Sequence, residues 1–333
     1  MTIKLGIIGT GIAAHDLHLP ALEKLKDKFE IVCVCNHTEP KAKEFSALVG
    51  GVPYFLDYRD LLKNREVEAV DIVLPIELNL QVTRDSLDAG KHVIVEKPIA
   101  PNLQDADTMS SFPGKYDRVM MVAENYRYNP VFKKIKSLTE DGTIGEPYSV
   151  FWDQFTVTDT DNKYAKTQWR INHKYPGGFV TDAGIHNIAV FRDLFGEIEK
   201  GIAFTRSVNP AIGRMDSMSF QFAFGSGVNG VFNMYFSAQG LNENRLMILG
   251  TTGTIVAEGN KIVLKRQGKT DVVESIETDR GYGGQFVDFH DCVVHGKKPL
   301  SSFEKACKDF RAMVKALDSA RKWESGALDF PKG

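Results

Sequence analysis

Two side chains four positions apart, Asp182 and His186, are the first candidates for chemistry in this chain of 333 residues. If residues 182–194 are helical, both side chains project from one face of the helix. Histidine has an intrinsic pKa of about 6.5, which suits it to exchange a proton with a hydroxyl, and a nearby carboxylate can hold hydroxyls or orient the imidazole. An isolated Asp-x-x-x-His more often joins a helix-start aspartate to an unrelated histidine, so the spacing alone leaves both interpretations open.

A lysine in the string Glu96-Lys97-Pro98 is the second candidate. The string follows an expected strand over residues 92–95, and open α/β sheets place their ligands at the carboxyl ends of such strands. An ammonium there can bind a hydroxyl and stabilise the alkoxide that develops as hydride leaves. Taken alone, Lys97 is equally well explained as a solvated surface lysine.

A glycine-rich turn at residues 9–14 indicates a dinucleotide site. It follows an expected strand (residues 3–8) and precedes an expected helix (residues 18–25), which is the context that this motif requires. Gly9 permits the tight turn, Gly11 lets the backbone approach a pyrophosphate, and the small Ala14 lets helix and strand pack closely. The alternative is a glycine turn in an unrelated α/β protein.

The residues at the end of the second expected strand indicate whether NAD or NADP binds. An acidic residue there usually binds the ribose 2′-hydroxyl of NAD, whereas polar or cationic side chains accommodate the 2′-phosphate of NADP. Asn36 occupies the expected acidic position and Lys41 lies near it, which favours NADP as the cofactor. Glu39 could still serve the ribose, so NAD stays open.

These candidates are carried by a chain whose first 122 residues alternate apolar strands with helical patterns. Such a rhythm predicts a parallel sheet covered by helices on both faces. From about residue 148 longer β-rich runs follow, and the Gly225-Ser226-Gly227 connection between two of them is a hairpin signal. We expect an α/β fold: an N-terminal doubly wound Rossmann domain (1–122) and a C-terminal α+β domain (123–333) with a mainly antiparallel sheet.

The composition is that of an ordinary globular protein. Lys and Arg total 41 against 43 for Asp and Glu, and this near balance argues against a nucleic-acid surface or a polybasic membrane anchor. No apolar run approaches the roughly 18 residues of a membrane span, and the N-terminus lacks the features of a signal peptide, so we expect a cytoplasmic protein. The four cysteines are expected to be buried, inert thiols. We expect no metal site, because His15 and His18 have no acidic ligands near them in sequence and are better explained by capping or packing.

The string from Ala89 to Pro98, AGKHVIVEKP, resembles the "aGKHV–EKP" segment of the glucose–fructose oxidoreductase and inositol dehydrogenase family. The resemblance extends nearly end to end, through Glu124-Asn125-Tyr126-Arg127, Trp169-Arg170, Gly177-Gly178, the DAGIH string from Asp182 to His186, and Gln285-Phe286. It implies an NAD(P)-dependent oxidoreductase that moves hydride between the nicotinamide and a sugar-, polyol- or cyclitol-like carbinol or carbonyl. It also implies a cis Lys97–Pro98 bond and an open-faced second sheet that forms a homodimer or homotetramer.

The resemblance assigns Lys97, Asp182 and His186 to the catalytic site. The residues expected to contact the cofactor are Gly9, Thr10, Gly11, Ile12, Ala13, Asn36, His37, Leu74, Pro75, Asn79, Glu96 and Lys97. Those expected to contact the substrate are Tyr126, Trp169, Arg170, Asp182 and His186. Tyr126, Arg127, Trp169 and Arg170 could equally be structural.

Two departures from the family pattern put the substrate in doubt. Ala189 stands where polyol-oxidising members commonly carry an acid, and Asn79 replaces a frequent histidine after a turn that reads Leu74-Pro75 here. The rival function is a catalytically silent, nucleotide-sensing regulator of the same fold. A third possibility is an enzyme that retains its cofactor between turnovers.

Overall fold

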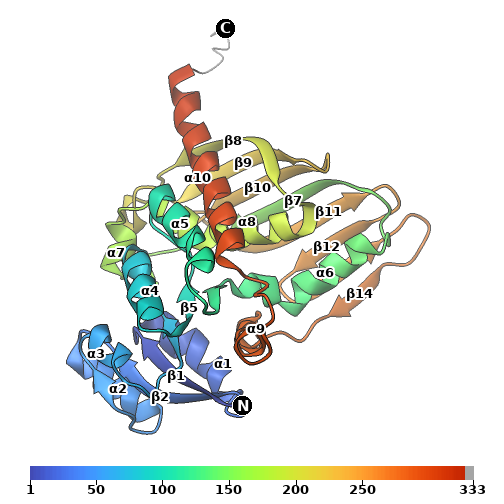
Figure 1. Ribbon diagram of the computed structural model, residues 1–333. Coiled ribbons are helices and arrows are strands. Elements are labelled where there is room, and N and C mark those ends of the chain that lie inside the picture. The colour runs from blue at the N-terminus through green and yellow to red at the C-terminus, as the bar shows by residue number, and fades with distance from the viewer. Residues whose placement is uncertain (327–333) are drawn as a thin grey trace. The chain divides into compact units, whose positions relative to one another are not determined.

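A parallel sheet of six strands is built from the first part of the chain (Figure 1). The computed structural model describes residues 1–326. The strands lie in the order β3-β2-β1-β4-β5-β6, and every neighbouring pair is parallel, so the expected doubly wound arrangement is confirmed. The strands are β1 (Ile3–Ile8), β2 (Phe29–Cys35), β3 (Tyr54–Phe55), β4 (Ala69–Ile72), β5 (His92–Glu96) and β6 (Met120–Ala123).

Helices connect these strands, and the first of them differs from the expected helix over residues 18–25. It is π-helical in η1 (Ala14–His18) and α-helical in α1 (Leu19–Glu23). Pro20 has no N–H, so it cannot continue the i→i−4 ladder, and the Leu19 N–H bonds back to Ala14 O in the wider π pattern. The other helices of this part are α2 (Glu39–Leu48), α3 (Tyr58–Leu62), η2 (Ile76–Leu78), α4 (Asn79–Asp88), α5 (Leu103–Ser110), η3 (Phe112–Gly114) and η4 (Asn125–Tyr128).

A second sheet of eight strands lies in the order β14-β13-β12-β11-β7-β10-β9-β8. Its described pairs are antiparallel except for β7 and β10, which run parallel, so the sheet is mainly antiparallel as expected. The Gly225–Gly227 connection joins β9 to β10 as an antiparallel pair, as expected. The strands are β7 (Pro147–Phe155), β8 (Ile198–Arg206), β9 (Ser217–Phe224), β10 (Asn229–Tyr235), β11 (Glu243–Gly250), β12 (Thr254–Glu258), β13 (Lys261–Lys265) and β14 (Val272–Ser275).

One face of this sheet is covered by α8 (Gly178–Phe195), as Figure 1 shows. The Phe191 ring of α8 lies 5.4 Å from the Trp152 ring of β7 and 5.7 Å from the Phe232 ring of β10, between centroids. Aromatic pairs at such distances add to the free energy of burial, so this contact fixes the helix on the sheet. The remaining helices here are α6 (Pro130–Glu140), α7 (Gln168–Ile171) and η5 (Pro210–Ile212).

The chain divides into two compact units that are not continuous in sequence. Unit 1 comprises Met1–Asn129 and Asp279–Phe310, and unit 2 comprises Pro130–Thr278 and the chain from Arg311 onward. The domain boundary that we expect near residue 123 stays a prediction, and it does not anticipate that α9 (Tyr282–His295) belongs to unit 1. The helix α10 (Phe303–Gly326) begins in unit 1 and ends in unit 2.

Aromatic side chains explain why α9 packs with unit 1. The rings of Phe286 and Phe289 lie 5.9 Å and 6.4 Å from the Phe29 ring of β2. Both are fully buried in the core of the parallel sheet. Within residues 1–326, no helix is long and apolar enough to cross a membrane.

Candidate active site

The glycine turn between β1 and η1 has the geometry of a dinucleotide cradle. Gly9 adopts a φ of +101°, and a Cβ there would lie 2.1 Å from the backbone oxygen of Val73, so only glycine fits. Gly11 is exposed, and a Cβ there would meet no atom within 4 Å, which leaves the backbone open to a pyrophosphate. Thr10 is buried, and Ile12 and Ala13 begin the helix that follows. The turn therefore fits the expected cofactor.

Asn36 joins the end of β2 to this glycine turn. Its amide nitrogen donates to Thr10 Oγ1 at 2.9 Å, and its amide oxygen accepts from the Thr38 N–H at 2.9 Å. Glu39, the alternative ribose partner, accepts instead from the Tyr54 hydroxyl at 3.1 Å. Lys41 and His37 are exposed beside this turn. Asn36, a neutral side chain, thus occupies the place where an acidic residue would select NAD.

The turn that carries Lys97 is held by two side chains. The Lys97–Pro98 bond is cis, as the family resemblance implies. The amide nitrogen of Asn79, at the start of α4, donates to the backbone oxygens of Glu96 and Pro98, each at 3.0 Å. One carboxylate oxygen of Glu96 accepts from the Lys97 N–H at 3.1 Å. Leu74 and Pro75, which follow β4 at the same edge of the parallel sheet, are half-buried.

A buried histidine, His18, contacts the Glu96 side chain of this turn. His18 Nδ1 lies 2.8 Å from Asp71 Oδ2, and His18 Nε2 lies 2.8 Å from Glu96 Oε1. The side chains of His18 and Asp71 are fully buried. Burial lowers the pKa of His18, but the Asp71 and Glu96 carboxylates more than offset this and raise it to about 10. The two carboxylates thus favour the charged form of the imidazole, while burial raises the pKa of Asp71.

Asp182 and His186 both lie on α8, so the expected helical spacing is confirmed. Gly177 and Gly178 open this helix with φ of +82° and +50°, and a Cβ at Gly178 would lie 2.6 Å from His173 Nε2. Gly184, between the two candidates, is close-packed, because a Cβ there would lie 2.8 Å from Met313 Cε. These glycines let α8 begin sharply and approach its neighbours, which places the helix start.

Asp182 is held by Arg170 of α7. Arg170 Nε donates to Asp182 Oδ2 at 2.8 Å, and both side chains are largely buried. The Arg170 guanidinium carbon lies 4.0 Å from the centroid of the Trp169 ring, a cation–π contact that orients the guanidinium plane. Three of the substrate residues expected in unit 2, Trp169, Arg170 and Asp182, therefore form one chain of contacts, and the fourth, His186, lies one turn further along α8.

Arg127 and Tyr126 are adjacent in sequence but have different surroundings. Arg127 Nη2 donates to Asp309 Oδ2 at 2.5 Å, and both side chains are almost fully buried, so this ion pair lies in the interior of unit 1. Tyr126 lies in η4 of unit 1, where burial raises the pKa of its phenol and Glu124 adds to the shift.

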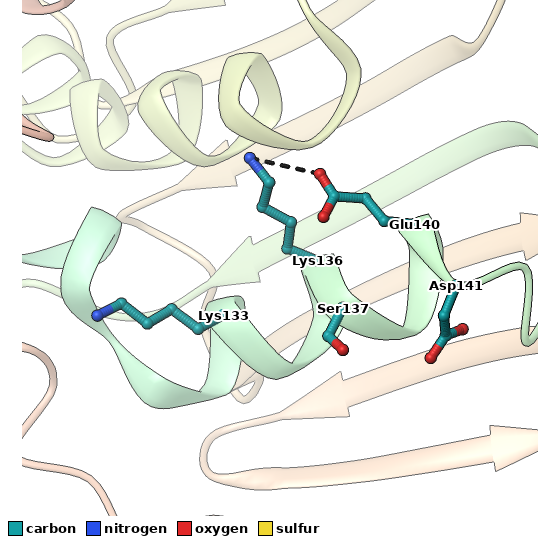
Figure 2. A pocket seen from close by; sticks show the side chains of 5 residues that line it. All are labelled: Lys133, Lys136, Ser137, Glu140 and Asp141. Atoms are coloured by element: carbon teal, nitrogen blue, oxygen red, sulfur yellow. Dashed lines mark ion pairs between the residues drawn. The ribbon is translucent and has the colours of Figure 1, made fainter.

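A shallow depression on α6, lined by Lys133, Lys136, Ser137, Glu140 and Asp141, contains none of the expected site residues (Figure 2). Lys136 and Glu140 form an ion pair across it at 3.6 Å.

Comparison with known proteins decides the family. A model described as an oxidoreductase family with an NAD-binding Rossmann fold matches residues 3–124, and one described as the GFO/IDH/MocA C-terminal domain matches residues 132–256. An uncharacterized protein of Saccharomyces cerevisiae, YMR315W, is 31% identical over 316 residues, which cover 90% of this chain and 89% of that protein. The chain belongs to the GFO/IDH/MocA family of oxidoreductases.

Two other members bear on this GFO/IDH/MocA oxidoreductase. The crystal structure of an oxidoreductase from Thermotoga maritima is 38% identical, with a TM-score of 0.91 and coverage of 96% of this chain and 97% of that one. A myo-inositol 2-dehydrogenase of the same organism is 26% identical over 261 residues, 77% of this chain and 75% of that one. The expected family, the nicotinamide-dependent oxidoreductase class and the dinucleotide-binding domain are thus confirmed, whereas the roles of individual residues stay predictions.

Proposed function

We propose that this oxidoreductase transfers hydride between a nicotinamide cofactor and a sugar-, polyol- or cyclitol-like carbinol or carbonyl. The observation that carries the proposal is the start of α8, where Asp182 and His186 stand one helical turn apart and Arg170 holds the Asp182 carboxylate. The myo-inositol 2-dehydrogenase among the relatives supports a polyhydroxylated substrate. When bound, the cofactor supplies the hydride donor or acceptor.

Side chains of the protein exchange the proton, bind the substrate and stabilise the developing charge. His186 exchanges the hydroxyl proton of the substrate, and Asp182 binds a neighbouring hydroxyl in the orientation that Arg170 imposes. The Lys97 ammonium binds the reacting oxygen and stabilises the negative charge that develops on it. Tyr126 and Trp169 supply aromatic faces that suit the apolar side of a sugar ring.

For the cofactor, we propose a preference for NADP over NAD. The supporting contacts are those of Asn36, whose amide holds the β2 turn to Thr10, and of Glu39, which is bonded to Tyr54. The exposed ammonium of Lys41 then offers a partner to a 2′-phosphate, and no carboxylate stands at position 36 to repel it. Binding titrations with NADPH and NADH test this preference. A tenfold or greater preference for NADH contradicts it.

We also propose that the chain forms a homodimer or homotetramer in the cytoplasm through the sheet of unit 2. The face opposite the α8 side carries Phe204, which is 49% exposed, together with the half-buried Phe155 and Tyr235. Large apolar side chains on an open sheet face favour association. Light scattering of the protein and of Phe204→Glu tests the proposal: the wild type is expected to be oligomeric and the variant smaller, and a monomeric wild type contradicts it.

The catalytic proposal is tested by absorbance at 340 nm with a panel of sugars and polyols, using both cofactors. Lys97→Met and His186→Ala are expected to lower kcat at least about 100-fold on the active substrate, because general acid–base and electrostatic terms are worth about 10²–10⁴ in rate. The exposed Lys115 and His295 provide matched controls, Lys115→Met and His295→Ala. Turnover of the two site variants within about threefold of wild type would show the assigned roles to be wrong.

A further inference from the structure

His18 connects three elements of unit 1 that are distant in sequence. It ends the π-helical turn after the glycine loop, and its ring nitrogens reach Asp71 on β4 and Glu96 at the end of β5. We propose that His18 is a positioning residue for Lys97: one hydrogen bond anchors its ring on Asp71, and the other fixes the Glu96 carboxylate, which in turn fixes the peptide that presents the Lys97 side chain. This inference rests on the proposed role of Lys97.

The number of protons in the cluster supports the proposal. An ionised carboxylate only accepts hydrogen bonds, and a neutral imidazole carries a single N–H. Since both ring nitrogens of His18 lie 2.8 Å from a carboxylate oxygen, a doubly protonated ring donates to Asp71 and Glu96 at once. The raised pKa of His18 agrees with this assignment. The ring edge also meets the Phe286 ring of α9 at 5.3 Å, and the Tyr282 phenol ring lies 6.3 Å away.

Glu96 transmits this constraint to the neighbouring residue. Its Oε1 bonds His18, and its Oε2 accepts from the Lys97 N–H at 3.1 Å. The carboxylate therefore cannot turn without losing one of the two bonds. Asn79 holds the carbonyls of Glu96 and Pro98 from another direction. Together these bonds hold the Lys97 peptide in a single orientation.

Packing alone does not require such a cluster. Taking Asp71 and His18 out of water is costly, and apolar residues of similar volume often replace a buried ionic group without loss of stability. What charged partners add is direction, because each hydrogen bond orients the group that it joins. Here the hydrogen bonds link His18, in the helix that follows the glycine loop, to Glu96 and so to the turn of Lys97. They therefore hold the glycine loop and the lysine turn in a fixed arrangement.

The first experiment needs no substitution and no substrate. In protein labelled with ¹⁵N at its eight histidines, His18 is expected to show two protonated ring nitrogens at pH 8, each with a directly bonded proton. A single protonated nitrogen on His18 at this pH overturns the proposal. This outcome is independent of any turnover assay.

The second experiment follows the Lys97 amide by hydrogen exchange. His18→Gln puts an amide oxygen against a carboxylate and is expected to raise exchange of the peptide that contains Glu96 and Lys97 at least about tenfold. Adding Asp71→Asn supplies a donor for that oxygen and is expected to restore exchange to within about threefold of wild type. The matched control is His290→Gln, since His290 is also buried and its ring nitrogens lie 2.8 Å from Met1 O and 3.6 Å from Asp291 Oδ1, with no contact to the turn of Lys97 among the described residues. If His18→Gln does not fold, Asp71→Asn alone is measured.

Kinetics give the last readout. His18→Gln is expected to lower kcat about 10- to 100-fold while the dissociation constant of the cofactor changes less than threefold, and the double variant is expected to recover most of kcat. Unchanged Lys97 exchange in a folded His18→Gln protein overturns the inference. If the wild type turns over nothing in the panel, the proposed function fails, whereas the NMR and exchange results still decide whether His18 fixes the turn.

Discussion

The turn Glu96–Pro98 and the helix α8 both carry proposed catalytic side chains, but they are held by different forces. The turn is fixed by polar bonds: His18 to Glu96, Glu96 to the Lys97 N–H, and Asn79 to two carbonyls. The helix is fixed mainly by apolar contacts of Phe191 and by the close approach that Gly184 allows.

Because they are held differently, the two segments should respond differently to substitutions and to pH. Polar bonds orient a group strongly, but they depend on the charge of every partner. Apolar packing depends on volume and hardly on pH. We therefore expect the turn of Lys97 to be sensitive to charge and protons, and α8 to be sensitive to side-chain volume.

The largest expected effect comes from removing a charge behind the turn. Asp71→Ala leaves His18 with one carboxylate partner in a fully buried site, and breaking a buried ion pair in this way costs about 3–5 kcal/mol. Unfolding in urea at pH 7 measures the loss. The control is Asp60→Ala, which removes the 55% exposed partner of Lys63, itself 77% exposed, and should cost far less. A loss below about 1 kcal/mol for Asp71→Ala would show that the cluster is not a charged one.

The next effect is a dependence of stability on pH. The pKa of His18 is raised from 6.5 to about 10 in the folded protein, so its contribution is fully present below pH 6.5 and is lost as pH rises through about 10. Between pH 7 and pH 10 the free energy of unfolding should fall by a few kcal/mol, since each pKa unit is worth about 1.4 kcal/mol. The groups that face the ring are Asp71, Glu96 and Tyr282.

The comparison with His18→Gln isolates this dependence. Tyrosines and other groups titrate in the same range, but they titrate in both proteins, so the difference between the two urea curves reports His18. The difference should shrink as pH rises from 7 to 10. A difference that stays constant across that range would mean that the ring is neutral in the folded protein.

Much of this arrangement is predictable from the sequence, because it is written in local patterns. The strands β1 and β5 are predicted to within one residue at either end, since apolar runs bounded by turns specify them. The helical spacing of Asp182 and His186 is local in the same way. The helix α5 is not among the expected elements, although Asn102 caps it by accepting from the Asp105 N–H.

The cluster behind Lys97 was not predictable in the same way. His18, Asp71 and Glu96 are brought together by the order of strands in the sheet, and we expected His18 only to cap or pack. One signal was present: Asp71 stands in the strand β4, whose other residues are apolar and buried, and a buried carboxylate needs a partner. The sequence does not say which residue is that partner. The packing of α9 with unit 1 is missed for the same reason, because it depends on contacts between distant segments.

The third prediction compares one substitution at two glycines. Gly9→Ala places a Cβ 2.1 Å from the backbone oxygen of Val73 at a φ of +101°, and the backbone cannot yield cheaply. The strain should cost about 1–3 kcal/mol and weaken cofactor binding. Gly184→Ala meets the flexible end of Met313, and alanine favours the helix by roughly 0.5–1 kcal/mol, so the net change should be below about 1 kcal/mol.

Thermal unfolding and cofactor titration measure both glycine variants. Gly184→Leu sharpens the result, because overpacking beside Met313 should cost about 1–3 kcal/mol. Equal losses for Gly9→Ala and Gly184→Ala would contradict the distinction between a turn limited by its backbone and a helix limited by side-chain volume.

The smallest expected effect concerns the bond from Arg170 to Asp182. Arg170→Lys keeps the charge but loses the planar guanidinium that stacks on Trp169 at 4.0 Å and bonds Asp182 through Nε. We expect kcat/KM on the active substrate to fall about 5- to 10-fold, roughly 1 kcal/mol, at every pH between 6 and 9. The exposed Arg206 provides the control, Arg206→Lys. Because α8 itself is held by Phe191 and its neighbours, the stability of Arg170→Lys should match that of the control. A loss of kcat/KM that appears only at high pH would instead mean that this helix, like the turn of Lys97, depends on a titrating partner.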